Sequence, residues 1–212
     1  LPKRSYFLPK PQSFLHYHTS RNKKIIAGLI RKLHGAITTT DYTHVNYYRT
    51  KYGNIPLWIT TSVLTFGSLS KMYNVLEQSL RSKICRHFSN INQRQLERFL
   101  SVLTKYRNVC AHADRLFSYR TVDQILDTPL HAKLNIPQQG NQYICGKQDL
   151  FAVVIAFRYL LPKEDFLKFK RKLTIEISRV NKKLIHITEN ELLEHMGFPK
   201  NWMNITRYTL TP

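Results

Sequence analysis

The sequence predicts an all-α protein, and three observations support that fold class. Apolar residues recur at spacings of three, four and seven over several segments, which is the spacing that places side chains on one face of an α-helix. Residue types that begin or end helices stand at the borders of these segments. The 212 residues are 42% hydrophobic and 12% aromatic, enough for a packed core.

The N-terminal third is expected to contain an extended arm and two helices. Three prolines among residues 1–20 favour an extended arm with interleaved aromatic side chains. Apolar spacing then predicts an amphipathic helix from Arg21 to Ile37. A shorter helix is predicted from Tyr42 to Lys51, and Gly53 is expected to end it.

The middle of the chain is expected to hold a long helix, the helix that carries the main motif, and a loop. Pro56 suits the first turn of a helix that reaches Leu80, with a kink or close helix contact predicted at Gly67. Asn92 is a cap for the next helix, whose apolar stripe extends to Cys110. Residues 127–149 are rich in proline, glycine and amides, which predicts a loop or a small hairpin.

Three further helices are predicted near the C-terminus. Leu150–Leu161 is almost wholly apolar and should be buried, whereas Pro162–Lys183 is basic and amphipathic. Thr188 and Glu191 form a capping box for a last short helix. No repeat and no clean domain border is visible, so residues 21–212 are predicted to form one domain.

The charge of the chain predicts a polyanionic partner. Lys and Arg number 33 against 13 Asp and Glu, a formal net charge of +20, and nucleic acid is the favoured partner over an acidic membrane. A solvated basic face is the alternative. No apolar run of membrane-spanning length and no signal peptide is visible, and three widely spaced cysteines suggest reduced thiols in the cytoplasm.

The segment Tyr106–His112 combines the residue types that a metal-free ribonuclease needs. Arg107 offers a forked, permanently charged contact to phosphate, and His112 can move protons near neutral pH. The two residues lie about 140° apart around an ideal helix. Arg107 falls on the predicted apolar stripe, so its side chain either curls toward His112 or meets a second copy of the helix across a two-fold axis. Alternatively, both side chains simply interact with the carbonyls at the helix end.

Other common chemistries are not supported by the sequence. The remaining histidines show no metal-ligand spacing, so no metal site is predicted. A phosphate-binding loop of the Gly-x-x-x-x-Gly-Lys type and a Gly-x-Ser-x-Gly elbow are both missing. No cofactor is expected.

Several separate segments resemble the Abi-like family of bacterial abortive-infection proteins, of the AbiD/AbiF type, and they occur in the order that the family shows. They are Tyr48–Gly53, Ile55–Trp58, Leu64–Ser70, Arg107–His112 with Arg115–Phe117, and Met196–Trp202. The resemblance runs from about Tyr17 to the C-terminus. This family belongs to the wider HEPN group of helical proteins, whose motif is an Arg, usually a polar residue next, and a His four to six residues on.

The resemblance implies a HEPN-like helical bundle, with additional C-terminal helices, that dimerises into a metal-independent endoribonuclease used in phage defence. Two departures from the family pattern bear on this expectation. Family members commonly begin with further helices before the segment equivalent to Tyr17, so we expect the chain to lack part of the usual bundle. Ser62 stands where relatives often have Glu, and Ala113 stands where they often have a polar residue, which bears on activity and site geometry.

The leading hypothesis is therefore a homodimeric ribonuclease with a composite site. His112 would act as general base or acid, Arg107 would stabilise the phosphorane charge, and Asn108 would orient the phosphate or His112. Lys105, Arg115 and Arg120 are expected to bind the RNA backbone. A catalytically weak module that holds a structured or regulatory RNA is the alternative, and a DNA-binding regulator is a third. A cognate antitoxin or RNA is a further expected partner.

Overall fold

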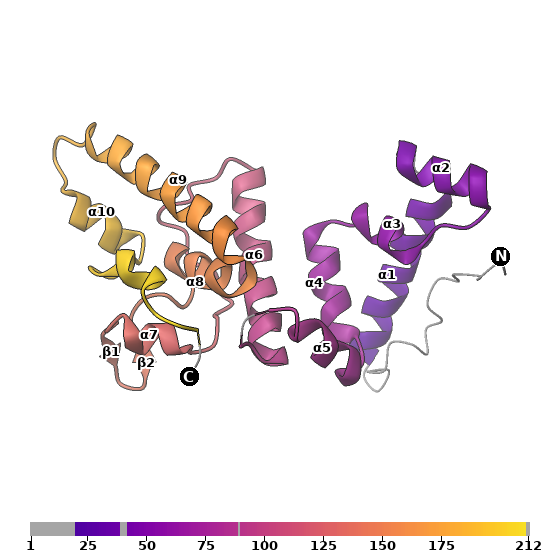
Figure 1. The fold of residues 1–212 in the computed structure, drawn as a ribbon, viewed down its shortest axis with the longest axis horizontal. Helices are drawn as coiled ribbons and strands as arrows, with labels where there is room; N and C mark the ends of the chain where they lie inside the picture. Colours follow the sequence, from indigo (N-terminus) through magenta and orange to yellow (C-terminus); the bar gives the residue numbers. More distant parts are fainter. Residues whose placement is uncertain (1–19, 39–41, 89, 211–212) are drawn as a thin grey trace. The chain divides into compact units, whose positions relative to one another are not determined.

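The computed structural model describes residues 20–38, 42–88 and 90–210, and these residues form two compact units, 1–83 and 84–212. The predicted arm over residues 1–20 lies outside the described residues except for Ser20. The described part is mostly helical with a single two-stranded hairpin, which confirms the all-α fold class (Figure 1). The assignment of residues 21–212 to one domain stays a prediction.

Five helices make up the first unit, the last of which continues two residues past its border. Their bounds are α1 Ser20–Thr38, α2 Thr43–Tyr52, α3 Leu57–Ser62, α4 Phe66–Val75 and α5 Gln78–Cys85. Helix α1 contacts α2, α3 and α4. Its apolar face carries Ile26 and Leu29, which pack with Val75 of α4. A second cluster joins Val45, Ile55 and Ile59.

The prediction of one long helix from Pro56 to Leu80 is wrong, because the helical structure is interrupted twice. The first break separates α3 from α4 at residues 63–65, ahead of the expected kink at Gly67. The Thr65 side chain accepts a hydrogen bond from the Ser68 backbone N–H at 3.3 Å, which starts a new helix. Gly67 therefore lies in the first turn of α4, and α5 follows after a second break.

The second unit packs four α-helices, a short helix and a hairpin around α8. Its elements are α6 Gln93–Ala111, α7 Pro129–Lys133, β1 Gln138–Gln139, β2 Gln142–Tyr143, α8 Leu150–Leu160, α9 Lys163–Asn181, α10 Glu189–His195 and the 3₁₀ helix η2 Trp202–Thr206. The two strands are antiparallel, with Gln138 opposite Tyr143. The predicted apolar helix is α8, the predicted cap at Asn92 begins α6, and the predicted capping box at Thr188 begins α10.

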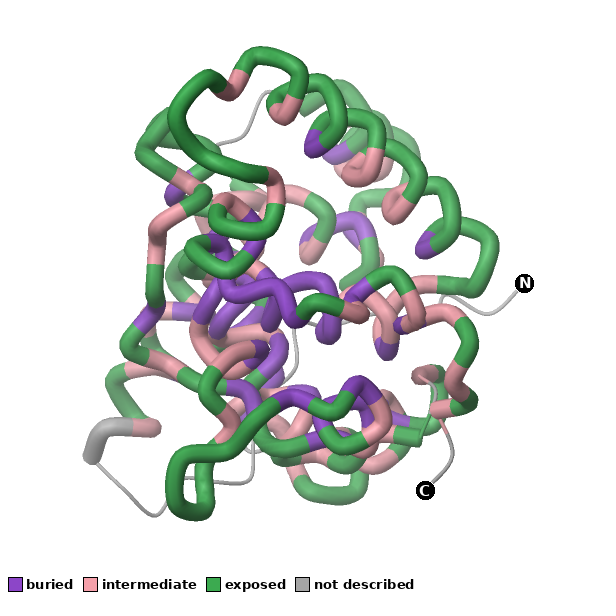
Figure 2. Tube along the Cα trace, turned by 90° about the vertical axis from the view of Figure 1, so that its left-hand side faces the viewer, coloured by how far each residue is buried: buried purple, intermediate pink, exposed green. Residues whose placement is uncertain are grey.

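The core of the second unit lies between α6 and α8. Residues 151–156 of α8 are all buried, as expected for its apolar sequence (Figure 2, purple). Phe99 of α6 stacks on Tyr159 of α8 with ring centroids 5.7 Å apart. Phe198 contacts both Phe151 and Trp202, so the C-terminal segment also closes on α8. Because residues 151–156 of α8 are all buried, this helix has almost no polar face.

Candidate functional site

The predicted catalytic motif lies at the C-terminal end of α6, where the helix closes with a Schellman motif. The helix ends at Ala111, and His112 is its C-cap with φ −95° and ψ 4°. Ala113 follows with φ +54°, in the left-handed region, and donates its N–H to the Cys110 carbonyl at 3.3 Å. The Asp114 N–H reaches the Val109 carbonyl at 3.0 Å. These two bonds fix the backbone on both sides of His112.

Arg107, Asn108 and His112 are all exposed at this helix end. The Arg107 Nη1 donates to the Asn108 Oδ1 at 3.4 Å, and the His112 backbone N–H donates to the Asn108 carbonyl at 3.0 Å. The described residues offer the His112 imidazole no side-chain hydrogen bond. The helix end thus presents a guanidinium, an amide and an imidazole to solvent.

The expectation that Arg107 lies on the apolar stripe is wrong. Tyr106 and Val109 continue the buried face of α6, while Arg107 and Cys110 point outward. The phenolic oxygen of Tyr106 donates to the Tyr119 carbonyl at 2.8 Å and lies 3.2 Å from the Gln148 carbonyl. The side chain of Tyr106, an aromatic ring with a polar tip, therefore occupies the buried position that the apolar spacing predicted for Arg107. Burial raises the pKa of Tyr106, so its hydroxyl keeps its proton.

The three predicted RNA-binding residues have different surroundings. Lys105 is exposed on α6. The Arg115 guanidinium carbon lies 5.9 Å from the Phe117 ring centroid, within range of a cation–π contact. Arg120 donates to the His195 carbonyl at 2.6 Å and to the Tyr119 carbonyl at 3.1 Å, so it holds the last turn of α10. Of the three, Arg120 therefore has a clear structural task.

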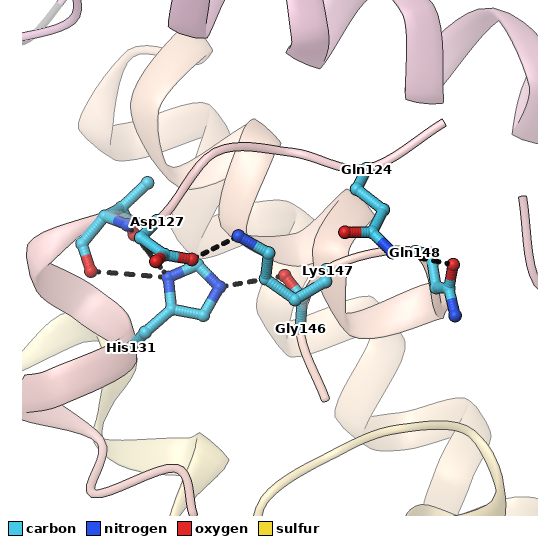
Figure 3. Close-up of polar contacts among 7 residues, drawn as sticks. Gln124, Asp127, His131, Gly146, Lys147 and Gln148 are labelled. Carbon is cyan, nitrogen blue, oxygen red and sulfur yellow. Dashed lines mark hydrogen bonds and ion pairs between the residues drawn. The ribbon is translucent and has the colours of Figure 1, made fainter. Parts of the chain in front are cut away.

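A second histidine, which the sequence did not single out, lies at the buried centre of this unit (Figure 3). His131 is 0% exposed, and its Nδ1 accepts the Thr128 N–H at 3.0 Å. Its Nε2 lies 3.0 Å from the Gly146 carbonyl, so this nitrogen carries the hydrogen and donates. Burial lowers the pKa of His131, which keeps the ring neutral. Both ring nitrogens are thus occupied, and the residue joins α7 to the turn before α8.

Asp149 stabilises the same turn from the start of α8. Its Oδ2 accepts the Gly146 N–H at 2.8 Å and its Oδ1 accepts the Ala152 N–H at 3.0 Å. Burial raises the pKa of Asp149 to about 6, whereas these two hydrogen bonds favour the ionised form. Gly197 ends α10 in the left-handed region with φ +82°, and a Cβ there would overlap the Asp149 carboxyl group. The carboxyl is therefore enclosed and serves the fold.

The loop from Tyr119 to Gln124 runs beside the same turn. Thr121 donates its N–H to the Gln148 carbonyl, and Ile125 donates to the Lys147 carbonyl, both at 2.9 Å. Figure 3 shows Lys147 paired with Asp127 and the side chains of Gln124 and Gln148 in contact at the surface. These bonds attach the loop to the turn before α8. They thereby fix the Tyr119 carbonyl, which accepts the hydrogen bond from Tyr106.

The first unit holds three further family-like segments, Tyr48–Gly53, Ile55–Trp58 and Leu64–Ser70. A pocket of about 320 Å³ is lined in part by Lys32, Thr65 and Ser68, and the Lys32 ammonium donates to the Ser68 hydroxyl at 2.9 Å. Ser62, at the position where relatives often have Glu, is exposed at the end of α3. Its hydroxyl lies 3.3 Å from His44 Nε2 and donates to the Ile59 carbonyl at 2.7 Å.

The described residues contain no group of three or more His, Cys, Asp or Glu side chains that could hold a metal ion. Cys145 is a poor nucleophile, because burial raises the pKa of its thiol to about 12. Among the helices of residues 20–38, 42–88 and 90–210, none has the length and apolar character needed to cross a membrane.

Comparison with known proteins identifies a family for the chain. A family model described as Abi-like protein matches residues 4–118, which is more than half of the chain. The chain belongs to this Abi-like family, whose membership suggests a role in abortive infection. Arg107–His112 lies inside the matched range, whereas Arg120, His131 and Met196–Trp202 lie beyond it. No curated protein and no solved structure matches the chain.

Proposed function

We propose that this protein is a metal-independent endoribonuclease of the HEPN group, of the AbiD/AbiF type, that cleaves RNA in the cytoplasm during abortive infection. The observation that carries the proposal is the exposure of Arg107, Asn108 and His112 together at one helix end. Family membership and the net charge of +20 support it.

The RNA itself would supply the nucleophile. His112 would take the proton from a ribose 2′-hydroxyl as that oxygen attacks the adjacent phosphorus, and the bond to the 5′-oxygen would break as that oxygen takes a proton from a water molecule. Arg107 would stabilise the charge on the phosphorane. Asn108, whose Oδ1 lies 3.4 Å from the Arg107 Nη1, would orient the phosphate or His112. Lys105 and Arg115 would contact neighbouring phosphates. The products would carry a 2′,3′-cyclic phosphate and a 5′-hydroxyl.

The test is incubation of end-labelled RNA with the purified full chain in EDTA, followed by analysis of the fragment ends. His112→Ala should lower the cleavage rate by about 10²-fold or more. His186→Ala is the matched control, because His186 is exposed in the loop before α10. Equal loss in both variants, or cleavage that EDTA abolishes, would contradict the proposal.

The proposed site is composite and formed by two copies of the chain, and mixed dimers test this part. Arg107→Ala and His112→Ala proteins, each inactive alone, should regain part of the activity when mixed. One hybrid site then combines the intact Arg107 of one chain with the intact His112 of the other. A site built within one chain gives no recovery.

The second candidate is a catalytically weak RNA-binding module that holds a structured or regulatory RNA. The exposed cations of α9 and of the turn that follows it favour this candidate, since Arg171, Lys172, Lys182 and Lys183 make no ion pair within the described residues. This candidate requires RNA that is bound without change in length, with equal affinity for the parent and His112→Ala. Affinity should in either case fall steeply with salt.

A further inference from the structure

The surface where α2 meets α3 carries an unusual group of exposed aromatic rings. We call Tyr47, Tyr48, Tyr52 and Trp58 the aromatic platform. Tyr47 is 49% exposed, Tyr52 58% and Trp58 64%. The ring centroids of Tyr48 and Tyr52 lie 5.5 Å apart, and those of Tyr48 and Trp58 lie 5.8 Å apart. Tyr48, Tyr52 and Trp58 come from two family-like segments to which the proposed cleavage site assigns no task.

The platform is rigidly mounted on the first unit. Tyr48 packs against the buried cluster of Val45, Ile55 and Ile59, so one ring anchors the other three. Gly53 ends α2 with φ +61° and donates its N–H to the Arg49 carbonyl at 3.0 Å. The chain can then turn back and place Trp58 beside Tyr48. The rings are therefore held in place before any partner arrives, which reduces the entropy cost of binding.

The platform also carries a positive charge, and no carboxylate pairs with it among the residues that the structure describes. The Lys51 ammonium donates to the Tyr47 hydroxyl at 2.6 Å and lies 5.0 and 5.5 Å from the ring centroids of Tyr47 and Tyr52. Glu77 is the single acidic residue among residues 20–38 and 42–83. The electrostatic field at the rings is thus that of a cation.

We propose that the aromatic platform binds single-stranded RNA, with unstacked bases against Tyr52 and Trp58 and a backbone phosphate at Lys51. Aromatic rings interleaved with cations are the means by which proteins hold single strands without reading their sequence. Exposed rings in contact with one another indicate an interaction surface. A second copy of this chain would bring the same positive charge to the surface, whereas a polyanion complements it.

This inference rests on the proposed function in taking RNA as the substrate, and it adds the class of RNA that is held. A duplex keeps its bases stacked on one another and cannot offer their faces to the platform. Single-stranded RNA should therefore bind more tightly than a duplex of the same sequence and length. Cleavage would then fall mainly in loops and unpaired regions.

The chain carries its own probe for the platform, because it has two tryptophans in opposite environments. Trp58 is 64% exposed and Trp202 is 4% exposed. We would titrate the full-length His112→Ala protein, which leaves RNA uncut, with an unlabelled single-stranded oligoribonucleotide. Stacking of a base on Trp58 should quench its emission. In a His112→Ala, Trp58→Phe protein, the remaining Trp202 emission should not respond.

Affinity is measured separately by anisotropy of a labelled oligonucleotide. Trp58→Ala and Tyr52→Ala should each weaken binding by about tenfold. Trp58→Phe keeps a ring and should retain most of the affinity, which separates stacking from a folding defect. Ile175→Ala is the control for loss of an exposed apolar side chain, and Lys71→Ala, also exposed and on α4, is the control for Lys51→Ala.

Three results would overturn the proposal: binding of RNA without a change in Trp58 emission, platform variants that bind as tightly as the parent, or equal affinity for duplex and single strand. A change in Trp58 emission with protein concentration alone would assign the surface to a second copy instead. The cleavage assay separates this proposal from the previous one. Platform variants that bind and cleave like the parent refute only the platform, and a chain that binds single strands through Trp58 without cleaving them refutes only the ribonuclease.

Discussion

Two histidines of the second unit, His112 and His131, show how differently one residue type can be used within one packed region. His131 is 0% exposed, and hydrogen bonds occupy both of its ring nitrogens. His112 is exposed at a helix end, and no side-chain hydrogen bond to its ring is present among the described residues. The first ring is committed to the fold, whereas the second is exposed to solvent.

A similar contrast, between a buried and an exposed position, exists between the C-terminal ends of α10 and α6. Both α6 and α10 close with Schellman hydrogen bonds, at 3.0 Å from Asp114 to Val109 and at 2.8 Å from Phe198 to Leu193. The left-handed residue is Gly197 where the backbone meets the buried Asp149, but Ala113 where the backbone faces solvent. A helix end that supports the core has no tolerance for a side chain, while an exposed one accepts a moderate strain.

The largest effect should come from Gly197→Ala. Alanine at φ +82° is strained, and its Cβ would overlap the Asp149 carboxyl, so we expect the free energy of unfolding to fall by about 3–5 kcal/mol. Gly140→Ala is the matched control: its φ is +62°, but a Cβ there meets nothing within 4 Å. That variant should lose only about 1–2 kcal/mol. Urea denaturation followed by circular dichroism measures both, and equal losses would show that the Asp149 contact is not tight.

The next largest effect should be the difference in stability between His131→Ala and His112→Ala. His131→Ala leaves the Gly146 carbonyl and the Thr128 N–H buried without their partner and opens a cavity, which should cost about 2–4 kcal/mol. His112→Ala should change stability by less than about 0.5 kcal/mol, because the ring is exposed. Thermal unfolding of both proteins measures this. A large loss from His112→Ala would mean that its effect on cleavage is structural.

The pH dependence of the His131 contribution is a smaller effect with a defined sign. Burial lowers the pKa of His131 in the folded state, so below the ordinary histidine pKa of about 6.5 the unfolded chain binds a proton that the folded one resists. The stability that His131 contributes is complete above that pH and is lost as the pH falls toward the folded-state pKa. The advantage of the parent over His131→Ala should therefore narrow between pH 7.5 and pH 5.5.

Asp149 acts in the opposite direction, which is why the comparison uses a difference between two proteins. Its pKa is raised to about 6, so its contribution is complete at low pH and is lost as the pH rises through about 6. Both proteins contain Asp149, and its effect cancels. A difference that stays constant from pH 7.5 to pH 5.5 would mean that His131 can be protonated in the folded state.

Local signals in the sequence were sufficient for most of the helices. The cap at Asn92 and the capping box of Thr188 with Glu191 depend only on residues close in the sequence, and both form as predicted. The structure adds Gln95, which completes a capping box with Asn92. The buried character of α8 follows from its apolar composition. The break before α4 was missed because Val63 and Leu64 continue the apolar run, while the deciding event is a Thr65 side chain that caps a new helix.

The candidate site was predicted in part, for a related reason. Spacing placed Arg107 on the α6 stripe, but the choice between Arg107 and the adjacent Tyr106 depends on carbonyls at Tyr119 and Gln148, and the second of these is 42 residues away. The task of His131 likewise depends on Gly146, which the hairpin brings close. Periodicity indicates which face of a helix is apolar. Which polar side chains are hydrogen-bonded depends on partners that only the folded chain brings close.

The smallest predicted effect tests why α6 keeps an alanine in the left-handed position. Ala113→Gly removes the strain of φ +54° and should raise the free energy of unfolding by about 1 kcal/mol. Ala111→Gly, inside the last turn of the same helix, is the control and should lower it by about 0.5–1 kcal/mol. We expect RNA cleavage by Ala113→Gly to stay close to that of the parent, because the bond from Asp114 to Val109 still holds the backbone around His112. A protein that gains stability but loses cleavage would show instead that the restricted backbone of Ala113 positions His112, and that the strain at this helix end serves the site.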